Sequence, residues 1–114
     1  MKNTESEDFN QRQLKIMADE LNEFKCQKIS LKYLIKRLKE IFWIIESMDK
    51  EWSESFLREW GTLETVYAIF LDQREQGILS GKKAEESINA REISILESVE
   101  KLEFLVQTKL EHRV

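Results

Sequence analysis

The sequence is 114 residues long and contains no proline, three glycines, 41% hydrophobic residues and 35% charged residues, with a formal net charge of −4. This length suits one domain with a single core, and the scarcity of helix breakers and of long alternating apolar and polar runs favours helices over strands. The longest uncharged apolar run, IFWII at 41–45, is far shorter than the roughly 18 residues of a membrane-spanning helix, and the polar N-terminus lacks the apolar segment of a secretion signal.

The first predicted helix covers about residues 7–24, and its apolar positions form an imperfect stripe of Phe9, Leu14, Ile16, Met17, Leu21 and Phe24. The segment KCQKIS at 25–30 interrupts this pattern. It holds the only cysteine, Cys26, which cannot form an internal disulfide and, with the missing secretion signal, indicates a reducing, cytoplasmic location. We expect Cys26 to be half-buried and structural rather than a thiol activated by the neighbouring lysines.

The second predicted helix covers residues 31–48. Ser30 is expected to cap it, because a serine hydroxyl can accept a hydrogen bond from a free N–H group of the first turn. The expected core face comprises Leu31, Leu34, Ile35, Leu38, Ile41, Phe42, Ile45 and Met48. Tyr33, Trp43 and Ile44 point away from this face. The helix is therefore either covered on two sides by its neighbours, which we prefer, or it presents an apolar patch to a partner.

A connection is expected at SMDKEWSES, residues 47–55, where Asp49 or Ser53 caps a third helix over about 54–76. The expected core stripe of this helix is Phe56, Trp60, Leu63, Tyr67, Phe70 and Leu71, with Leu57 and Val66 at its edges. Glu64 lies beside the stripe, so we expect its carboxylate to be partly desolvated and hydrogen-bonded inside the bundle. Gly61 lies off the stripe, where it either permits the close approach of another helix or a partner, or has no role.

The segment QGILSGKK at 76–83 is the clearest loop. A fourth helix is predicted from about residue 84 to residue 110, with Ile88, Ile95, Val99, Leu102 and Val106 in register and Leu96 and Leu105 alongside. Four helices with short connections predict a single all-α domain over residues 1–114, an antiparallel bundle of about four helices.

The sequence lacks the groups of residues that catalysis or metal binding requires. The only histidine, His112, stands near the C-terminus, and there is no Glu-x-x-His pair, glycine-rich phosphate loop or zinc-binding spacing. We therefore expect no enzymatic activity and no cofactor or metal. Residues 25–40 carry six basic side chains and one acidic side chain, but Lys32, Lys36 and Lys39 share one solvated flank. Because the rest of the chain is acidic, we expect no binding to nucleic acid.

Residues 28–76 resemble a family of small all-helical bacterial immunity proteins, the antitoxins encoded beside polymorphic or contact-dependent growth-inhibition toxins. The resemblance lies in ISLKYLI, in the aromatic and aliphatic block before ES, and above all in FLREWGTLETVYAIFLD, and it extends loosely to the fourth helix. It implies that the protein binds one cognate toxin domain tightly and blocks it inside the producing cell. Many such toxins are nucleases with basic clefts, which an acidic inhibitor suits because opposite charges speed association.

Under this resemblance, acidic residues around the third helix are expected to cover a basic toxin cleft. The candidate partner-binding residues are Asp49, Glu51, Glu54, Glu59, Asp72 and Glu75, with Tyr33 and Trp43 on the second helix. For each carboxylate the alternative is an ordinary solvated helix face. For the whole protein the alternative is a homo-oligomeric adaptor or regulator, in which Tyr33, Trp43 and Ile44 bury against a second copy. We expect the free protein to be a monomer or a dimer, without a membrane partner.

Overall fold

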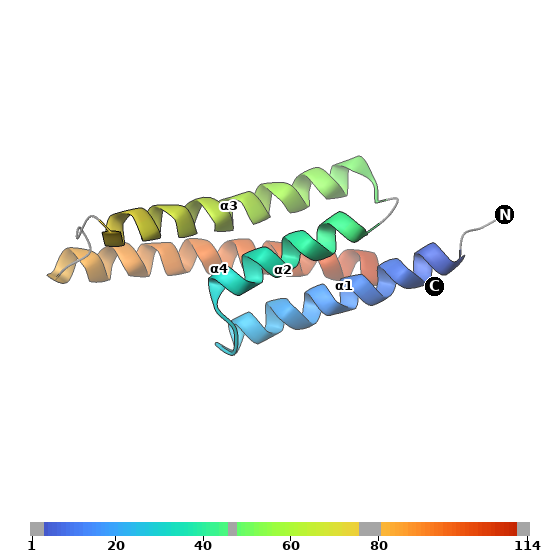
Figure 1. Ribbon diagram of the computed structural model, residues 1–114, viewed down its shortest axis with the longest axis horizontal. Coiled ribbons are helices and arrows are strands. Elements are labelled where there is room, and N and C mark those ends of the chain that lie inside the picture. The colour runs from blue at the N-terminus through green and yellow to red at the C-terminus, as the bar shows by residue number, and fades with distance from the viewer. Residues whose placement is uncertain (1–3, 46–47, 76–80, 112–114) are drawn as a thin grey trace.

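The computed structural model describes the backbone of residues 4–45, 48–75 and 81–111 and the side chains of residues 8–45, 48–72 and 91–110. Helices make up nearly all of this backbone, and the described residues contain no strand, which confirms the predicted all-α fold (Figure 1). The helices are α1 (Thr4–Lys25), α2 (Leu31–Ile44), α3 (Lys50–Glu75) and α4 (Gly81–Glu111).

Local capping sets the boundary between α1 and α2. Ser30 has extended backbone angles, and its Oγ accepts a hydrogen bond from the Tyr33 N–H at 3.1 Å, which confirms the predicted cap. The first helix ends where Gln27 takes a positive φ of 62° and the N–H of Lys28 donates to the carbonyl of Glu23 at 2.9 Å. Glycine is the usual residue at such a left-handed stop. Because this position holds glutamine and not glycine, the sequence indicated the end of α1 only by the interruption of its apolar pattern.

The connection between α2 and α3 lies four residues earlier in the chain than the predicted helix boundaries placed it. The second helix ends at Ile44 and the third begins at Lys50, each four residues before its predicted boundary. The early start of α3 is due to Asp49, whose Oδ2 accepts a hydrogen bond from the Trp52 N–H at 2.9 Å. Of the two caps that the sequence allowed, Asp49 is therefore the one used, and Ser53 lies inside the helix.

Each helix runs antiparallel to the next one along the chain and packs against two neighbours (Figure 1). Because α4 contacts both α3 and α1, the four helices close into a bundle. The fourth helix begins at Gly81, three residues before its predicted start, and the rest of the predicted loop, 76–80, lies outside the described residues. The structure measures 61 × 22 × 20 Å, and it is elongated because the four helices run side by side along one direction (Figure 1).

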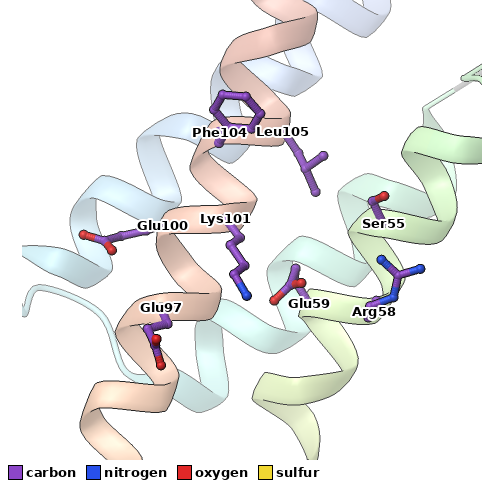
Figure 2. Close-up of a pocket in the computed structure, with 8 residues that line it drawn as sticks. All are labelled: Ser55, Arg58, Glu59, Glu97, Glu100, Lys101, Phe104 and Leu105. Carbon is purple, nitrogen blue, oxygen red and sulfur yellow. The ribbon is translucent and has the colours of Figure 1, made fainter.

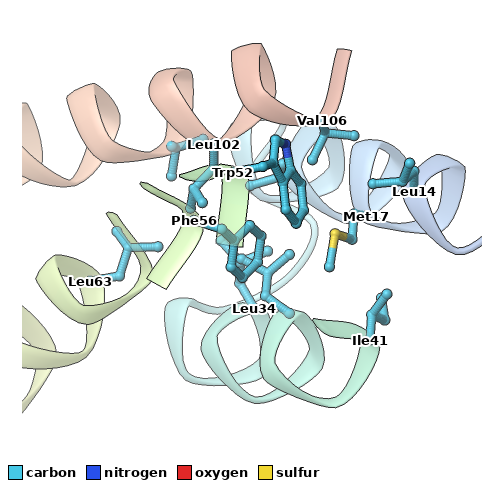
Figure 3. Close-up of a cluster of buried hydrophobic side chains, with 12 residues drawn as sticks. Leu14, Met17, Leu34, Ile41, Trp52, Phe56, Leu63, Leu102 and Val106 are labelled. Carbon is cyan, nitrogen blue, oxygen red and sulfur yellow. The ribbon is translucent and has the colours of Figure 1, made fainter. Parts of the chain in front are cut away.

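The hydrophobic core lies where the four helices meet, and Figure 3 shows side chains from all of them in it. Its buried hydrophobic residues are Leu14, Met17, Leu21, Leu34, Leu38, Ile41, Trp52, Phe56, Leu63, Val99, Leu102 and Val106. All of them except Trp52 belong to the predicted stripes, because the helical period of 3.6 residues places them on one face of their helix.

Trp52 is the core residue that the sequence did not predict, since it stands in the segment expected to be a connection. Its side chain is only 5% exposed and stacks with Phe56 at a centroid distance of 5.4 Å and with Phe42 at 6.4 Å. The indole Nε1–H donates to the carbonyl of Leu105 at 2.9 Å. Trp52 therefore connects α2, α3 and α4.

Several apolar side chains remain exposed where the sequence predicted cover. The outer side of α2 keeps Tyr33, Trp43 and Ile44 exposed, so the preferred expectation that neighbours cover this helix on two sides is wrong for these residues. Leu71 of the predicted α3 stripe and Leu96 of α4 are exposed as well. The reason is that α1 and α3 cover only the inner flanks of α2, and that α1 and α2 are shorter than the helices they cover.

Gly61 lies in the interior of α3, and a Cβ atom added to it would meet nothing within 4 Å. The close approach of another helix of this chain therefore does not explain this glycine. Because glycine loses more conformational freedom than alanine when a helix forms, we expect Gly61→Ala to raise the free energy of unfolding by about 0.5–1 kcal/mol. Urea unfolding followed by circular dichroism measures this change, and a lowered stability would contradict it.

Candidate functional site

A groove of about 480 Å³ lies between α3 and α4, shown in Figure 2. It is lined by Ser55, Arg58 and Glu59 from α3 and by Glu97, Glu100, Lys101, Phe104 and Leu105 from α4. We call this surface the α3/α4 groove. The groove runs along the outside of the bundle, because Phe56 on α3 and Leu102 on α4 point the other way into the core.

Helical spacing brings these side chains together. Positions 100 and 101 lie three and four residues after position 97 and four and three residues before position 104, so all four share one face of α4. Positions 55, 58 and 59 do the same on α3. About forty residues of sequence separate the two sets, and only the packing of α3 on α4 places them opposite each other.

Charges of both signs line the groove, with carboxylates in excess. Glu59, Glu97 and Glu100 stand against Arg58 and Lys101, and Figure 2 shows Glu59 and Lys101 pointing toward each other from opposite helices. On the α1 side of α4, Glu103 accepts a hydrogen bond from Lys25 at 3.0 Å, which raises the pKa of that lysine. The carboxylate of Glu103 thus binds a lysine of a neighbouring helix, whereas the carboxylates of the groove face outward.

Phe104 at the rim of the groove is 71% exposed, the largest exposed fraction among the large hydrophobic side chains described. A single exposed hydrophobic residue is ordinary on a protein surface. Here it stands beside a concave surface with carboxylates around it, and an aromatic residue inside a polar rim is the usual composition of an interface centre. An arrangement of this kind suits contact with the surface of another protein.

The structure brings only part of the predicted acidic set to this groove. Glu59 lines it, and Glu51 and Glu54 are exposed on the adjoining outer face of α3. Asp72 is also exposed, but it stands 13 residues beyond Glu59, about 20 Å along the helix. The side chain of Glu75 lies outside the described residues. The predicted residues therefore do not form one cluster.

Two further expectations about single residues are wrong. Glu64 is exposed rather than partly desolvated inside the bundle, because its position on α3 turns it toward the lysines of α2 at the surface. Cys26 is exposed rather than half-buried, because it follows the last turn of α1 where the chain leaves the bundle.

The α3/α4 groove contains residues that the sequence did not single out, namely Glu97, Glu100, Lys101 and Phe104. The apolar pattern of the fourth helix contains an indication of one of them, Phe104. The apolar register of the fourth helix runs through Ile95, Val99, Leu102 and Val106, and Phe104 does not belong to it. An aromatic residue out of register on a charged helix face is a candidate for contact with a partner.

Tyr33 and Trp43, the other predicted partner-binding residues, lie on α2, which has no contact with α4 in the described part of the bundle. Tyr33 is close to Glu20 of α1, which raises the pKa of the phenol. Glu20 also lies 3.4 Å from Arg37, which in turn lies 3.6 Å from Glu40. These polar contacts tie the outer side of α2 to α1.

Asp49 is held by contacts within the bundle. Besides capping α3, its carboxylate accepts a hydrogen bond from Lys109 in the last turn of α4. The hydrogen bond from Lys109 and, after it, the one from the Trp52 N–H lower the pKa of Asp49. A lowered pKa in the folded state means that this carboxylate contributes stability above its unfolded pKa, about 4, and that the contribution is lost as the pH falls through the folded value.

We therefore expect Asp49→Asn, which keeps a capping side chain but removes the charge, to be less stable than the wild type at pH 7. The difference should begin to shrink as the pH falls below about 4, the unfolded pKa, and should disappear as the pH falls through the lower folded pKa, where the wild type loses its own charge. Urea unfolding at several pH values between 7 and 2.5 measures this. Asp19→Asn is the matched control, because Asp19 makes only an exposed ion pair of 3.9 Å with Lys15. A difference for Asp49→Asn that does not change with pH would contradict the assignment.

Within the described residues, no group of three or more histidine, cysteine, aspartate or glutamate side chains could hold a metal ion. His112 lies outside the described residues. No described helix is long and apolar enough to cross a membrane.

Comparison of the chain with protein-family models, with curated proteins and with solved structures gave no significant match.

Proposed function

We propose that this protein is an immunity protein, which binds a cognate toxin domain in the cytoplasm of the producing cell and neutralises it by stoichiometric inhibition. The observation that carries the proposal is the α3/α4 groove, where an exposed aromatic side chain stands beside a concave surface rich in carboxylates. The class of partner rests on the resemblance of residues 28–76 to immunity proteins.

The toxin that we propose is a nuclease with a basic cleft. Glu59 and Glu97 in the groove, with Glu51 on the adjoining face of α3, would accept hydrogen bonds from lysine and arginine side chains of the cleft. Opposite charges steer the two proteins together, and this effect weakens as salt is added. Phe104 would supply the apolar contact from which water is excluded, so that the complex dissociates slowly.

A homo-oligomeric adaptor remains the second candidate function, because Tyr33, Trp43 and Ile44 are exposed at 45%, 68% and 49%. The arrangement of the outer side of α2 favours it less. Arg37 and Glu40 lie between Tyr33 and Ile44 on the same helix face, so the apolar residues do not form one continuous patch.

Co-expression with the product of the reading frame immediately upstream tests the proposal. We expect the wild-type protein to restore growth of cells that produce this toxin, whereas an empty vector does not. Cys26→Ser should protect as well as the wild type, because Cys26 is exposed and lies outside the groove. Cell death despite soluble wild-type protein would overturn the proposal. A pull-down of the two purified proteins then shows whether the protection involves direct binding.

A further inference from the structure

The outer side of α2 carries a row of basic side chains that ends in a tryptophan. Lys32, Lys36, Lys39 and Trp43 follow one another at intervals of four, three and four residues, so they share one face of the helix. All four side chains are exposed, and Trp43 is 68% exposed. Within the described residues α2 contacts α1 and α3 but not α4, so the bundle leaves this row uncovered. We call it the α2 row.

The lysines of the α2 row carry charge that the bundle does not neutralise. They belong to residues 25–40, which hold six basic side chains and one acidic side chain. Within this segment Lys25 binds Glu103 of α4 at 3.0 Å, and Arg37 lies 3.4 Å from Glu20 of α1. The lysines of the row form no ion pair with any described residue. Their charge is therefore available to carboxylates of another molecule.

A second row of exposed positions lies on α3, and its residue types are the counterparts of those in the α2 row. Leu57, Gly61 and Glu64 stand at intervals of four and three residues on one face of α3. Leu57 is 41% exposed, and Glu64 is exposed in a groove of about 280 Å³ that the lysines also line. We call these residues the α3 row. It offers an apolar side chain, a position without a side chain and a carboxylate.

Contacts between α2 and α3 show that the two rows stand level with each other. Phe42 of α2 stacks on Phe56 of α3 at a centroid distance of 4.9 Å, and the Nζ atom of Lys39 lies 5.5 Å from the ring centroid of Trp60. The helices are antiparallel neighbours (Figure 1). The tryptophan of the α2 row therefore stands about level with the leucine of the α3 row, and the middle lysine about level with the glutamate. Together the two rows form the α2/α3 face.

We propose that two copies of this chain pack their α2/α3 faces together around a two-fold axis that runs between the two rows, parallel to the helices. A two-fold interface joins the same surface of both copies, so this surface must be complementary to itself. Rotation about this axis places each α2 row on the α3 row of the other copy, at the same position along the bundle. Trp43 then meets Leu57 and Lys36 meets Glu64, and each contact occurs twice.

Gly61 and Leu57 favour a second copy over an unrelated acidic protein. A Cβ atom on Gly61 would meet nothing within 4 Å, so the packing of one chain does not explain this glycine. In the dimer Gly61 lies opposite Lys39 of the other copy, and the missing side chain lets the apolar stem of that lysine lie against α3. An unrelated acidic partner would account for the lysines alone, whereas a second copy also accounts for the exposed leucine and the glycine.

Sedimentation equilibrium of the purified protein over a wide concentration range tests the proposal. An interface that depends on exposed charge pairs and few apolar contacts is weak, so we expect a dissociation constant of about 10–100 μM in about 50 mM salt. Dimers should then predominate at a protein concentration of about 500 μM. Because salt screens exposed charges, about 500 mM salt should raise the dissociation constant by about tenfold.

A charge exchange tests whether the face is complementary to itself. Lys36→Glu and Glu64→Lys should each raise the dissociation constant at least about tenfold, because each creates two like-charge contacts in the dimer. The double variant should recover most of the affinity, since the pairs are then reversed but intact. Lys15→Glu is the matched control, because it changes the net charge equally at an exposed lysine of α1 and should leave the dimer unchanged. Circular dichroism verifies that each variant is folded.

The apolar contact has its own test. Trp43→Ala should raise the dissociation constant of the dimer at least about 30-fold, since it removes an aromatic contact that occurs twice. Phe104→Ala is the matched control, because Phe104 is 71% exposed but lies on α4, outside the α2/α3 face. It should leave the dimer unchanged.

A wild-type protein that stays monomeric at about 500 μM in low salt would overturn the proposal and leave the lysines to an acidic partner. A double charge exchange that recovers no affinity would overturn the two-fold arrangement. Dissociation caused by Ile44→Ala but not by Trp43→Ala would also overturn it, and would place the contact on the α1 side of α2. The inference goes beyond the proposed function and can fail separately from it, since sedimentation uses the protein alone and the rescue experiment uses growth.

Discussion

Replacing Trp52 by alanine is expected to lower the free energy of unfolding by about 3–5 kcal/mol, the largest stability effect of any single substitution discussed for this protein. The indole is almost fully buried against Phe42 and Phe56, so its removal leaves a cavity where three helices meet. It also leaves the carbonyl of Leu105 without its hydrogen-bond donor. Urea unfolding monitored by circular dichroism measures the loss.

Trp60→Ala is the matched control, because Trp60 is on the same helix and its indole N–H also donates to a carbonyl, that of Ile35, at 2.9 Å. Its ring is only partly buried and lies beneath Lys39, whose Nζ is 5.5 Å from the centroid. We expect Trp60→Ala to cost clearly less than Trp52→Ala, since less apolar area returns to water. A loss below about 1 kcal/mol for Trp52→Ala would show that Trp52 is not a core residue.

The largest expected effect on binding is that of Phe104→Ala, which should weaken the complex with the toxin domain by about 30-fold or more, equivalent to about 2 kcal/mol. Phe104 is 71% exposed in the free protein, so its truncation does not disturb the core. Most of the loss should be in the dissociation rate, because an apolar anchor acts after the proteins have met. Surface plasmon resonance with the immobilised toxin domain measures both rates.

Trp43→Ala is the control for this measurement, since Trp43 is an aromatic residue of similar exposure, 68%, on the outer side of α2. We expect a change of less than about threefold. If Trp43→Ala weakens the complex and Phe104→Ala does not, the toxin binds α2 rather than the α3/α4 groove. Unchanged stability of both variants in urea separates an effect on binding from an effect on folding.

The structure spreads the carboxylates that the sequence proposed for partner binding over separate parts of the surface. Carboxylates on one helix are visible in the sequence as a charged face, and of this set Glu59 lines the α3/α4 groove. Asp49 was counted with them, although the structure uses it to cap α3 and to bind Lys109 on α4. A sequence pattern describes one helix at a time, so it cannot distinguish a carboxylate that faces solvent from one that faces a neighbouring helix.

Local patterns in the sequence predict the helices and almost all of the core. Leu34, Leu38 and Ile41 are buried as predicted, because a repeat of three and four residues fixes which side chains share a helix face whatever packs against it. The cap at Ser30 was equally visible, since it depends on a hydrogen bond between residues three positions apart. Such features require only local geometry, and local geometry can be calculated from the order of the residues.

The remaining features depend on how the helices pack against one another. Trp52 stands between charged and polar neighbours, and its burial depends on Phe42 from α2 and on the Leu105 carbonyl from α4. The α3/α4 groove likewise unites residues 55–59 with residues 97–105. Each of these features depends on the distance between segments far apart in the chain, and helical periodicity contains no information about that distance.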